Sequence, residues 1–129
     1  MAGPPSDALS RCLADNTTGR DRKELARWVF VAMAAHPEIQ DLAGQTGKAR
    51  EDTSRYVGGL VTRLLTESCT QEARTAFQSE GSAAFKVAFG SLGQLAMQEL
   101  MTNPQVSSSF SNIEKYVDQK KLAAISGGK

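Results

Sequence analysis

The sequence predicts an all-α protein, and three observations lead to that class. Apolar residues recur at helical spacing along almost the whole chain, without the alternation of β-branched residues that is typical of a strand. Two segments, at about residues 19–35 and 82–102, are apolar enough to be central helices. Turn-forming and capping residues separate the remaining amphipathic segments. Because 129 residues suit one domain, we expect a single helical bundle with shorter amphipathic helices around the two apolar ones.

The expected domain covers residues 6–125. Residues 1–5 and 126–129 are rich in small residues and proline, and we expect them to be disordered tails. Ser6 can cap a short first helix, because its hydroxyl can accept a bond from a free N–H of the first turn. The turn formers at residues 15–19 end that helix.

The second helix begins with a capping box, in which Thr18 and Asp21 can each bond the other's backbone N–H. After Trp28 the segment is apolar round its whole circumference, which predicts burial on every side. His36 precedes a proline, a position that disfavours helical backbone, so the helix should end at or before His36.

The sequence pattern in the middle of the chain predicts three helices. Pro37 suits the first turn of a short one that ends near Gly44. Residues 46–68 form one long helix, which is charged in its first half and apolar in its second. A short amphipathic helix at residues 70–80 is closed by Gly81.

The second central helix follows at residues 82–102. Asn103 and the proline after it then supply a cap and a first-turn residue for the next helix. Ser111 and Glu114 have the spacing of another capping box, which would begin the last one or two short helices.

The charged half of the long helix is a candidate interaction surface. Lys48 and Asp52 are four residues apart, as are Glu51 and Arg55, so both pairs can form on a solvated helix face. Tyr56 lies where this arm becomes apolar, and we expect a homodimer to use the same region.

Glycines lie inside two expected helices, where each costs about 1 kcal/mol relative to alanine. A ligand that approaches bare backbone could explain them. Close packing of two helices is the interpretation that we favour. The positions concerned are Gly58, Gly59, Gly90 and Gly93.

Cys12 and Cys69 are the chain's two cysteines, and each continues the inward face of its helix near the end of that helix. In an oxidising compartment they would form a disulfide, which in turn favours an exported protein. Two buried free thiols in a cytosolic protein are the alternative.

The residues that could carry chemistry are few. His36 is the only histidine, so a metal site or a catalytic triad would depend on it alone, and a helix-terminal residue that caps a carbonyl explains it better. Paired carboxylates are the remaining route to catalysis, and surface ion pairs explain them more often. The acids concerned are Glu67, Glu72, Glu80 and Glu99. We predict no enzyme activity, no cofactor and no metal.

Charge is balanced, at 15 Lys plus Arg against 14 Asp plus Glu, and aromatic residues make up 6% of the chain, so nucleic acid is not an expected partner. No apolar run is long enough for membrane insertion. We therefore expect a non-catalytic protein that binds another protein, as an inhibitor, immunity or adaptor protein does, in the bacterial periplasm or otherwise exported. A cytoplasmic protein is the alternative location. The alternative function is a carrier of a small apolar ligand among Trp28, Met33, Phe85 and Phe89.

Overall fold

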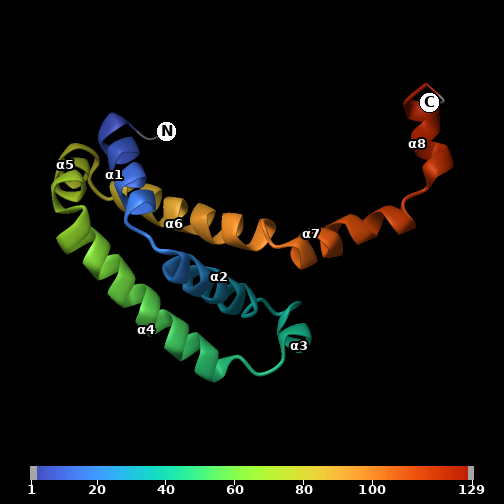
Figure 1. Cartoon of the computed structure of the whole chain (residues 1–129), viewed down its shortest axis with the longest axis horizontal. Coiled ribbons are helices and arrows are strands. Elements are labelled where there is room, and N and C mark those ends of the chain that lie inside the picture. Colours follow the sequence, from blue (N-terminus) through green and yellow to red (C-terminus); the bar gives the residue numbers. More distant parts are fainter. Residues whose placement is uncertain (1–2, 128–129) are drawn as a thin grey trace. The chain divides into compact units, whose positions relative to one another are not determined.

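The computed structural model describes residues 3–127, which form helices joined by turns and short irregular segments and include no strand (Figure 1). This confirms the all-α class. Backbone contacts divide the chain into two compact units, Met1–Glu99 and Leu100–Lys129.

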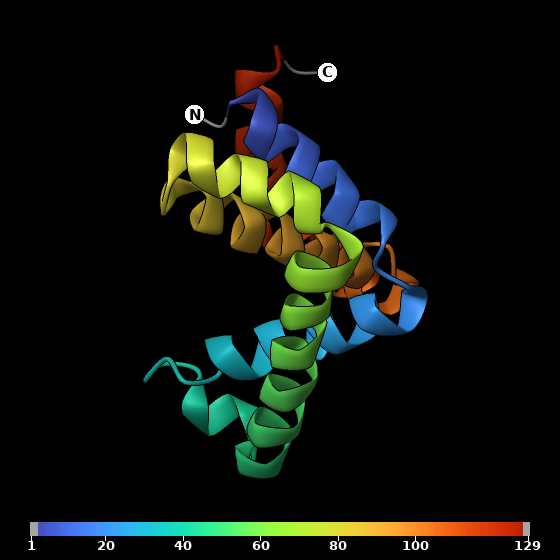
Figure 2. The ribbon, with the colours of Figure 1, turned by 90° about the vertical axis from the view of Figure 1, so that its left-hand side faces the viewer.

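The first unit holds two pairs of packed helices. Helix α1 lies beside α5, and α2 lies beside α4 (Figures 1 and 2). The helices are α1 (Pro4–Asp15), α2 (Gly19–Met33), α3 (Gln40–Ala43), α4 (Gly47–Arg63), α5 (Thr70–Glu80) and α6 (Ala83–Met101), and a π-helical turn, Leu64–Ser68, follows α4. Residues of α1, α2, α4, α5, α6 and the π-helical turn form one apolar core, which includes Leu9, Leu13, Leu25, Leu60, Leu64 and Leu92.

The second unit consists of α7 (Pro104–Ser111), a 3₁₀ turn (Asn112–Tyr116) and α8 (Gln119–Ile125). None of its described residues is buried. Its large apolar side chains are exposed instead, among them Phe110, Ile113, Tyr116 and Ile125.

The first helix begins earlier than the sequence predicts. Helix α1 starts at Pro4, because proline lacks the N–H that the first turn would leave unpaired and its backbone angle already suits a helix. Ser6 therefore does not cap the helix; it lies inside it, buried, and its hydroxyl donates to a carboxylate oxygen of Glu80. Of the tail expected at residues 1–5, Met1 and Ala2 lie outside the described residues.

Two other cap predictions have opposite outcomes. The box at Thr18 and Asp21 is present, with both backbone-to-side-chain bonds made. Ser111 caps nothing, because the chain there is still helical and runs from α7 directly into the 3₁₀ turn. Asp118 caps the following helix instead, since its carboxylate accepts from the backbone N–H of Lys121.

The expectation of burial on every side of the central helices is wrong. Phe30 and Met33 on α2 are 50% and 60% exposed, and Phe85 and Phe89 on α6 are 45% and 46% exposed. Trp28 is partly buried against the core. The physical reason is size: a unit of about 100 residues has too few helices to cover both faces of each one.

The turn after α2 also differs from the prediction. Pro37 lies in a turn rather than in the first turn of a helix, and α3 begins only at Gln40. Gly44 ends α3 as expected, with a positive φ of 70° that favours glycine.

Candidate functional site: a disulfide, a buried carboxylate and an exposed apolar patch

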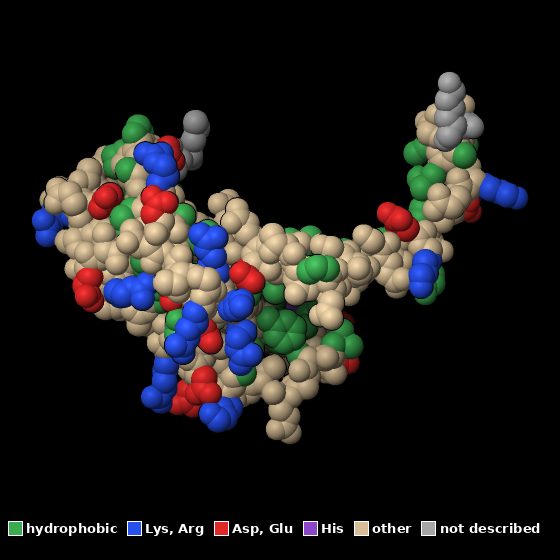
Figure 3. All heavy atoms as spheres, viewed as in Figure 1, with side chains coloured by type: hydrophobic (Ala, Val, Ile, Leu, Met, Phe, Trp, Pro, Cys, Tyr) green, Lys and Arg blue, Asp and Glu red, His purple; other side chains and the backbone are tan. Residues whose placement is uncertain are grey.

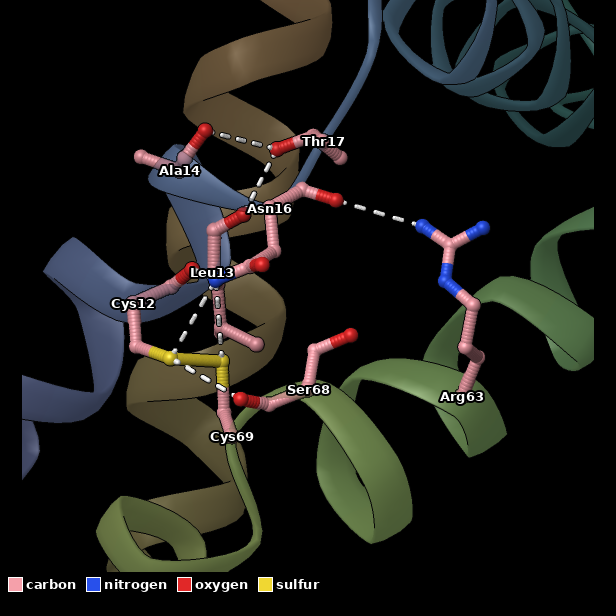
Figure 4. Close-up of a disulfide and its surroundings, with 8 residues drawn as sticks. All are labelled: Cys12, Leu13, Ala14, Asn16, Thr17, Arg63, Ser68 and Cys69. Carbon is pink, nitrogen blue, oxygen red and sulfur yellow. Dashed lines mark hydrogen bonds between the residues drawn. A yellow bond between two sulfur atoms is a disulfide. The ribbon is translucent and has the colours of Figure 1, made fainter.

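Cys12 and Cys69 form the predicted disulfide, with their Cα atoms 5.9 Å apart (Figure 4). Cys12 lies in α1, and Cys69 lies between the π-helical turn and α5. The bridge therefore fixes the carboxyl-terminal end of α1 to the junction of two later helices. With a separation of 57 residues, it closes a loop over nearly half the chain.

The side chain of Asn16 makes polar contacts at the disulfide. Its side-chain amide donates to the carbonyl of Cys12 at 2.9 Å and lies 3.5 Å and 3.8 Å from the two sulfur atoms (Figure 4). The sulfur of Cys12 also lies 3.7 Å from the carbonyl oxygen of Ser68. A disulfide sulfur has no hydrogen to donate, so this last approach is a contact only.

The two sulfur-bearing residues differ in access. Cys69 is 0% exposed, whereas Cys12 is partly exposed and lines an open hollow of about 490 Å³. The hollow presents one basic group, Arg11, and two acidic groups, Asp15 and Glu72; its uncharged lining residues besides Cys12 are Ala8, Asn16 and Ser68.

A second polar cluster joins α2 to α4 at Asp21, which is 2% exposed. The hydroxyl of Tyr56 donates to one carboxylate oxygen at 2.7 Å, and the guanidinium of Arg63 donates to the other at 3.1 Å. Arg63 also donates to the carbonyl of Asn16 (Figure 4), and the guanidinium of Arg20 lies 5.3 Å from the centre of the Tyr56 ring. These contacts link the capping box of α2 to the end of α1.

Burial raises the pKa of Asp21, but bonds from the backbone N–H of Thr18, from Tyr56 and from Arg63 outweigh it, so the pKa lies below its ordinary value of 3.8. The bond to Asp21 is also the main reason that the pKa of Tyr56 lies above 10.0. Both shifts favour a carboxylate that is ionised and a phenol that keeps its proton.

Tyr56 therefore belongs to a helix–helix contact rather than to the exposed arm in which the sequence places it. The remainder of the arm has the expected form, with ion pairs of 2.9 Å between Lys48 and Asp52 and of 2.6 Å between Arg55 and Glu51. All four side chains are more than half exposed, so these pairs contribute little stability.

Close packing at the interior glycines is not found within the described residues. A Cβ atom added at any of these positions would have no neighbour within 4 Å. This holds for Gly58, Gly59, Gly90 and Gly93. Helix α4 buries Thr53, Val57 and Leu60 instead, which lie on its other side from Gly58 and Gly59.

The histidine and the carboxylates have local roles. His36 is exposed, and its Nδ1 accepts from the backbone N–H of Glu38 at 3.0 Å, so the predicted bond to a carbonyl is wrong. Among the four acids considered for catalysis, Glu80 bonds Ser6 and Glu67 is exposed. No group of three potential metal ligands occurs among residues 3–127.

Sequence reasoning missed a group of exposed apolar side chains at the end of α2, in the turn that follows it and on α3, here called the patch. Its members are Phe30, Met33, Ile39 and Leu42, which are 50%, 60%, 37% and 77% exposed. Figure 3 shows apolar side chains at the surface near this end of the first unit, with lysine and arginine side chains over α2 and α4. Leu42 could have indicated an exposed apolar surface from the sequence, because it lies in a segment that is too short to bury it.

An apolar cavity beside Phe89 has a volume of about 10 Å³ and is lined by Leu13, Val61, Leu64, Leu65, Ala88 and Leu92. A pocket for a small ligand usually measures about 300–1,000 Å³. This cavity therefore gives no support to the carrier alternative.

The fold and these features define a disulfide-bonded all-α protein. Within residues 3–127, no helix combines the length and the apolar character needed to cross a membrane. Comparisons of the chain with protein-family models, with curated proteins and with solved structures found no match.

Proposed function

We propose that this chain is a non-catalytic binding protein whose patch of Phe30, Met33, Ile39 and Leu42 contacts another protein. The observation that carries the proposal is the exposure of Met33 and Leu42, which are 60% and 77% exposed although they are large apolar side chains. A patch of this kind, with polar residues around it, is typical of a surface that a partner covers.

The charged residues near the patch carry both signs. Arg27 lies one turn before Phe30 on α2, and the guanidinium of Arg50 donates to the carbonyl of Val31. The exposed acids Glu38 and Asp41 adjoin Ile39 and Leu42 in the chain. The partner surface would therefore combine an apolar centre with groups of both signs at its rim.

We also propose an exported location, which is compatible with this function. A disulfide that joins separate helices persists in oxidising compartments and is rare in a reducing cytosol. The bridge between Cys12 and Cys69 therefore favours the periplasm or another exported location. Trapping of free thiols in intact cells of the native host tests this, and two alkylated cysteines in the folded protein would contradict it.

Site-specific photocrosslinking in the native host tests the binding surface. A photoreactive residue at Met33 should give one covalent adduct of defined mass, because the partner covers this position. The same residue at exposed Gln78 on α5 is the matched control and should give none. The substitution Leu42→Ser should abolish the Met33 adduct while helix content stays unchanged. Equal adducts at both positions, or none at Met33, would contradict the proposal.

A further inference from the structure

The disulfide is asymmetric in the access that it offers to an incoming group. Cys12 is partly exposed and lines the open polar hollow, whereas Cys69 is 0% exposed and belongs to the core. Exchange with an external thiol begins when a thiolate attacks one sulfur atom along a path that solvent can reach. Access therefore directs attack to Cys12.

The helix ends add a second asymmetry, which concerns the sulfur that leaves. Cys69 is the N-cap residue of α5, and no side chain caps that end. A helix amino terminus stabilises a thiolate and lowers its pKa. Cys12 lies in the last turn of α1, at the negative end of the helix dipole, which disfavours a thiolate there. The helix start therefore favours departure of the Cys69 thiolate, against the cost of a charge at a buried position, and access decides which sulfur is attacked.

Asn16 supplies a polar donor at the same place. Its amide nitrogen lies 3.8 Å from the sulfur of Cys69 and 3.5 Å from that of Cys12. A sulfur atom that gains a full negative charge becomes a stronger acceptor. The amide can therefore stabilise the thiolate of Cys69 as the bond between the sulfurs breaks.

We propose that the disulfide is a site of reversible, position-specific thiol exchange in which Cys12 is the residue modified. The incoming thiolate forms a new disulfide with the sulfur of Cys12. The bond between Cys12 and Cys69 breaks, its electron pair goes to Cys69, and that residue leaves as a thiolate. Attack by Cys69 on the mixed disulfide reverses the step and releases the external thiol, so no other oxidant or reductant is required.

The external thiolate can come from a low-molecular-weight thiol or from the reactive cysteine of a dithiol oxidoreductase. The hollow beside Cys12 measures about 490 Å³ and presents Arg11, Asp15 and Glu72. Groups of both signs suit a small zwitterionic thiol such as glutathione, which also carries both. Glutathione should therefore react faster than a thioredoxin-type protein that lacks its second cysteine.

The experiment treats the folded, oxidised protein with glutathione, traps freed thiols at once with N-ethylmaleimide, and digests the protein with trypsin. Cleavage places the two cysteines in separate peptides, residues 12–20 and 64–74. Glutathione should lie on Cys12 and maleimide on Cys69, with at least about tenfold preference over the reverse. Glutathione mainly on Cys69, equal shares, or no adduct would overturn the proposal.

Two controls test why exchange should prefer Cys12 and whether Asn16 assists the leaving thiolate. In concentrated urea the helix ends and the burial are lost, so both cysteines should react to similar extents. Asn16→Ala should slow exchange in the folded protein several-fold, because the leaving thiolate loses a donor. Asn112→Ala is the matched variant, since Asn112 likewise caps the end of a helix, and it should leave the rate unchanged. An unchanged rate for Asn16→Ala would remove the role of this residue, and a slower thioredoxin-type arm would confirm the small thiol as the source.

Discussion

The hydroxyl of Tyr56 donates a hydrogen bond of 2.7 Å to the carboxylate of Asp21, although the two residues lie 35 positions apart in the chain. Asp21 is also a member of the capping box of α2. One buried carboxylate thus both begins α2 and fixes it to α4. The stability of this helix pair should depend on the ionised form of Asp21.

Tyr56→Phe should lower the free energy of unfolding by about 1.5 kcal/mol, the lower value for a hydrogen bond to a charged group. The ring remains, so its packing and its contact with Arg20 are kept and the change isolates the hydroxyl. Urea unfolding measures the difference. Tyr116→Phe is the matched control, because Tyr116 is 79% exposed and should show no change.

Stability should fall in acid because of Asp21. Its pKa in the folded protein is below the ordinary value of 3.8, so its contribution is complete above that value. The contribution is lost as the pH falls through the folded-state pKa. Asp21→Asn should reduce stability at neutral pH and flatten this acid limb in urea unfolding at a series of pH values. The exposed Asp41→Asn is the control, and an acid limb that survives intact in Asp21→Asn would contradict the assignment.

Two leucines test the boundary between core and surface. Leu25 is 0% exposed and Leu42 is 77% exposed. Leu25→Ala should cost about 2–5 kcal/mol, because it removes buried methyl groups and leaves a cavity. Leu42→Ala should change stability by less than about 0.5 kcal/mol. Equal losses in the two variants, measured by thermal unfolding, would show that Leu42 is covered in the isolated protein.

Gly59→Ala should stabilise the protein by about 0.5–1 kcal/mol, since alanine loses less backbone entropy in a helix and nothing lies within 4 Å of the added Cβ. Urea unfolding measures the gain. The homodimer expected at this region stays a prediction, and sedimentation tests it. If Gly58 and Gly59 contact a second copy, Gly59→Ala should weaken the dimer while it stabilises the monomer.

Replacement of both cysteines by serine should lower the free energy of unfolding by about 4 kcal/mol on the chain-entropy estimate for a loop of this length. Hydrogen exchange should then accelerate first in α1, because the bridge fixes its carboxyl-terminal end. Exchange in α2 and α4 should change less, since those helices contact each other. Uniform acceleration over all three helices would contradict this order.

The sequence by itself determined the helices and most of their ends. Helical spacing of apolar residues and strong local signals, such as the box at Thr18 and the cap at Asn103, depend only on residues a few positions apart. The inward placement of Cys12 and Cys69 followed from the same periodicity, and so the disulfide was predictable.

Only the tertiary structure decided which apolar residues are covered. The apolar part of α2 after Trp28 was expected to be buried on every side, yet Phe30 is 50% exposed and Met33 is 60% exposed. The hydrogen bond from Tyr56 could not be predicted from the sequence either, because its partner Asp21 belongs to another helix. Burial and long-range bonds depend on which helix faces meet, and periodicity in one helix does not specify which helix its neighbour will be.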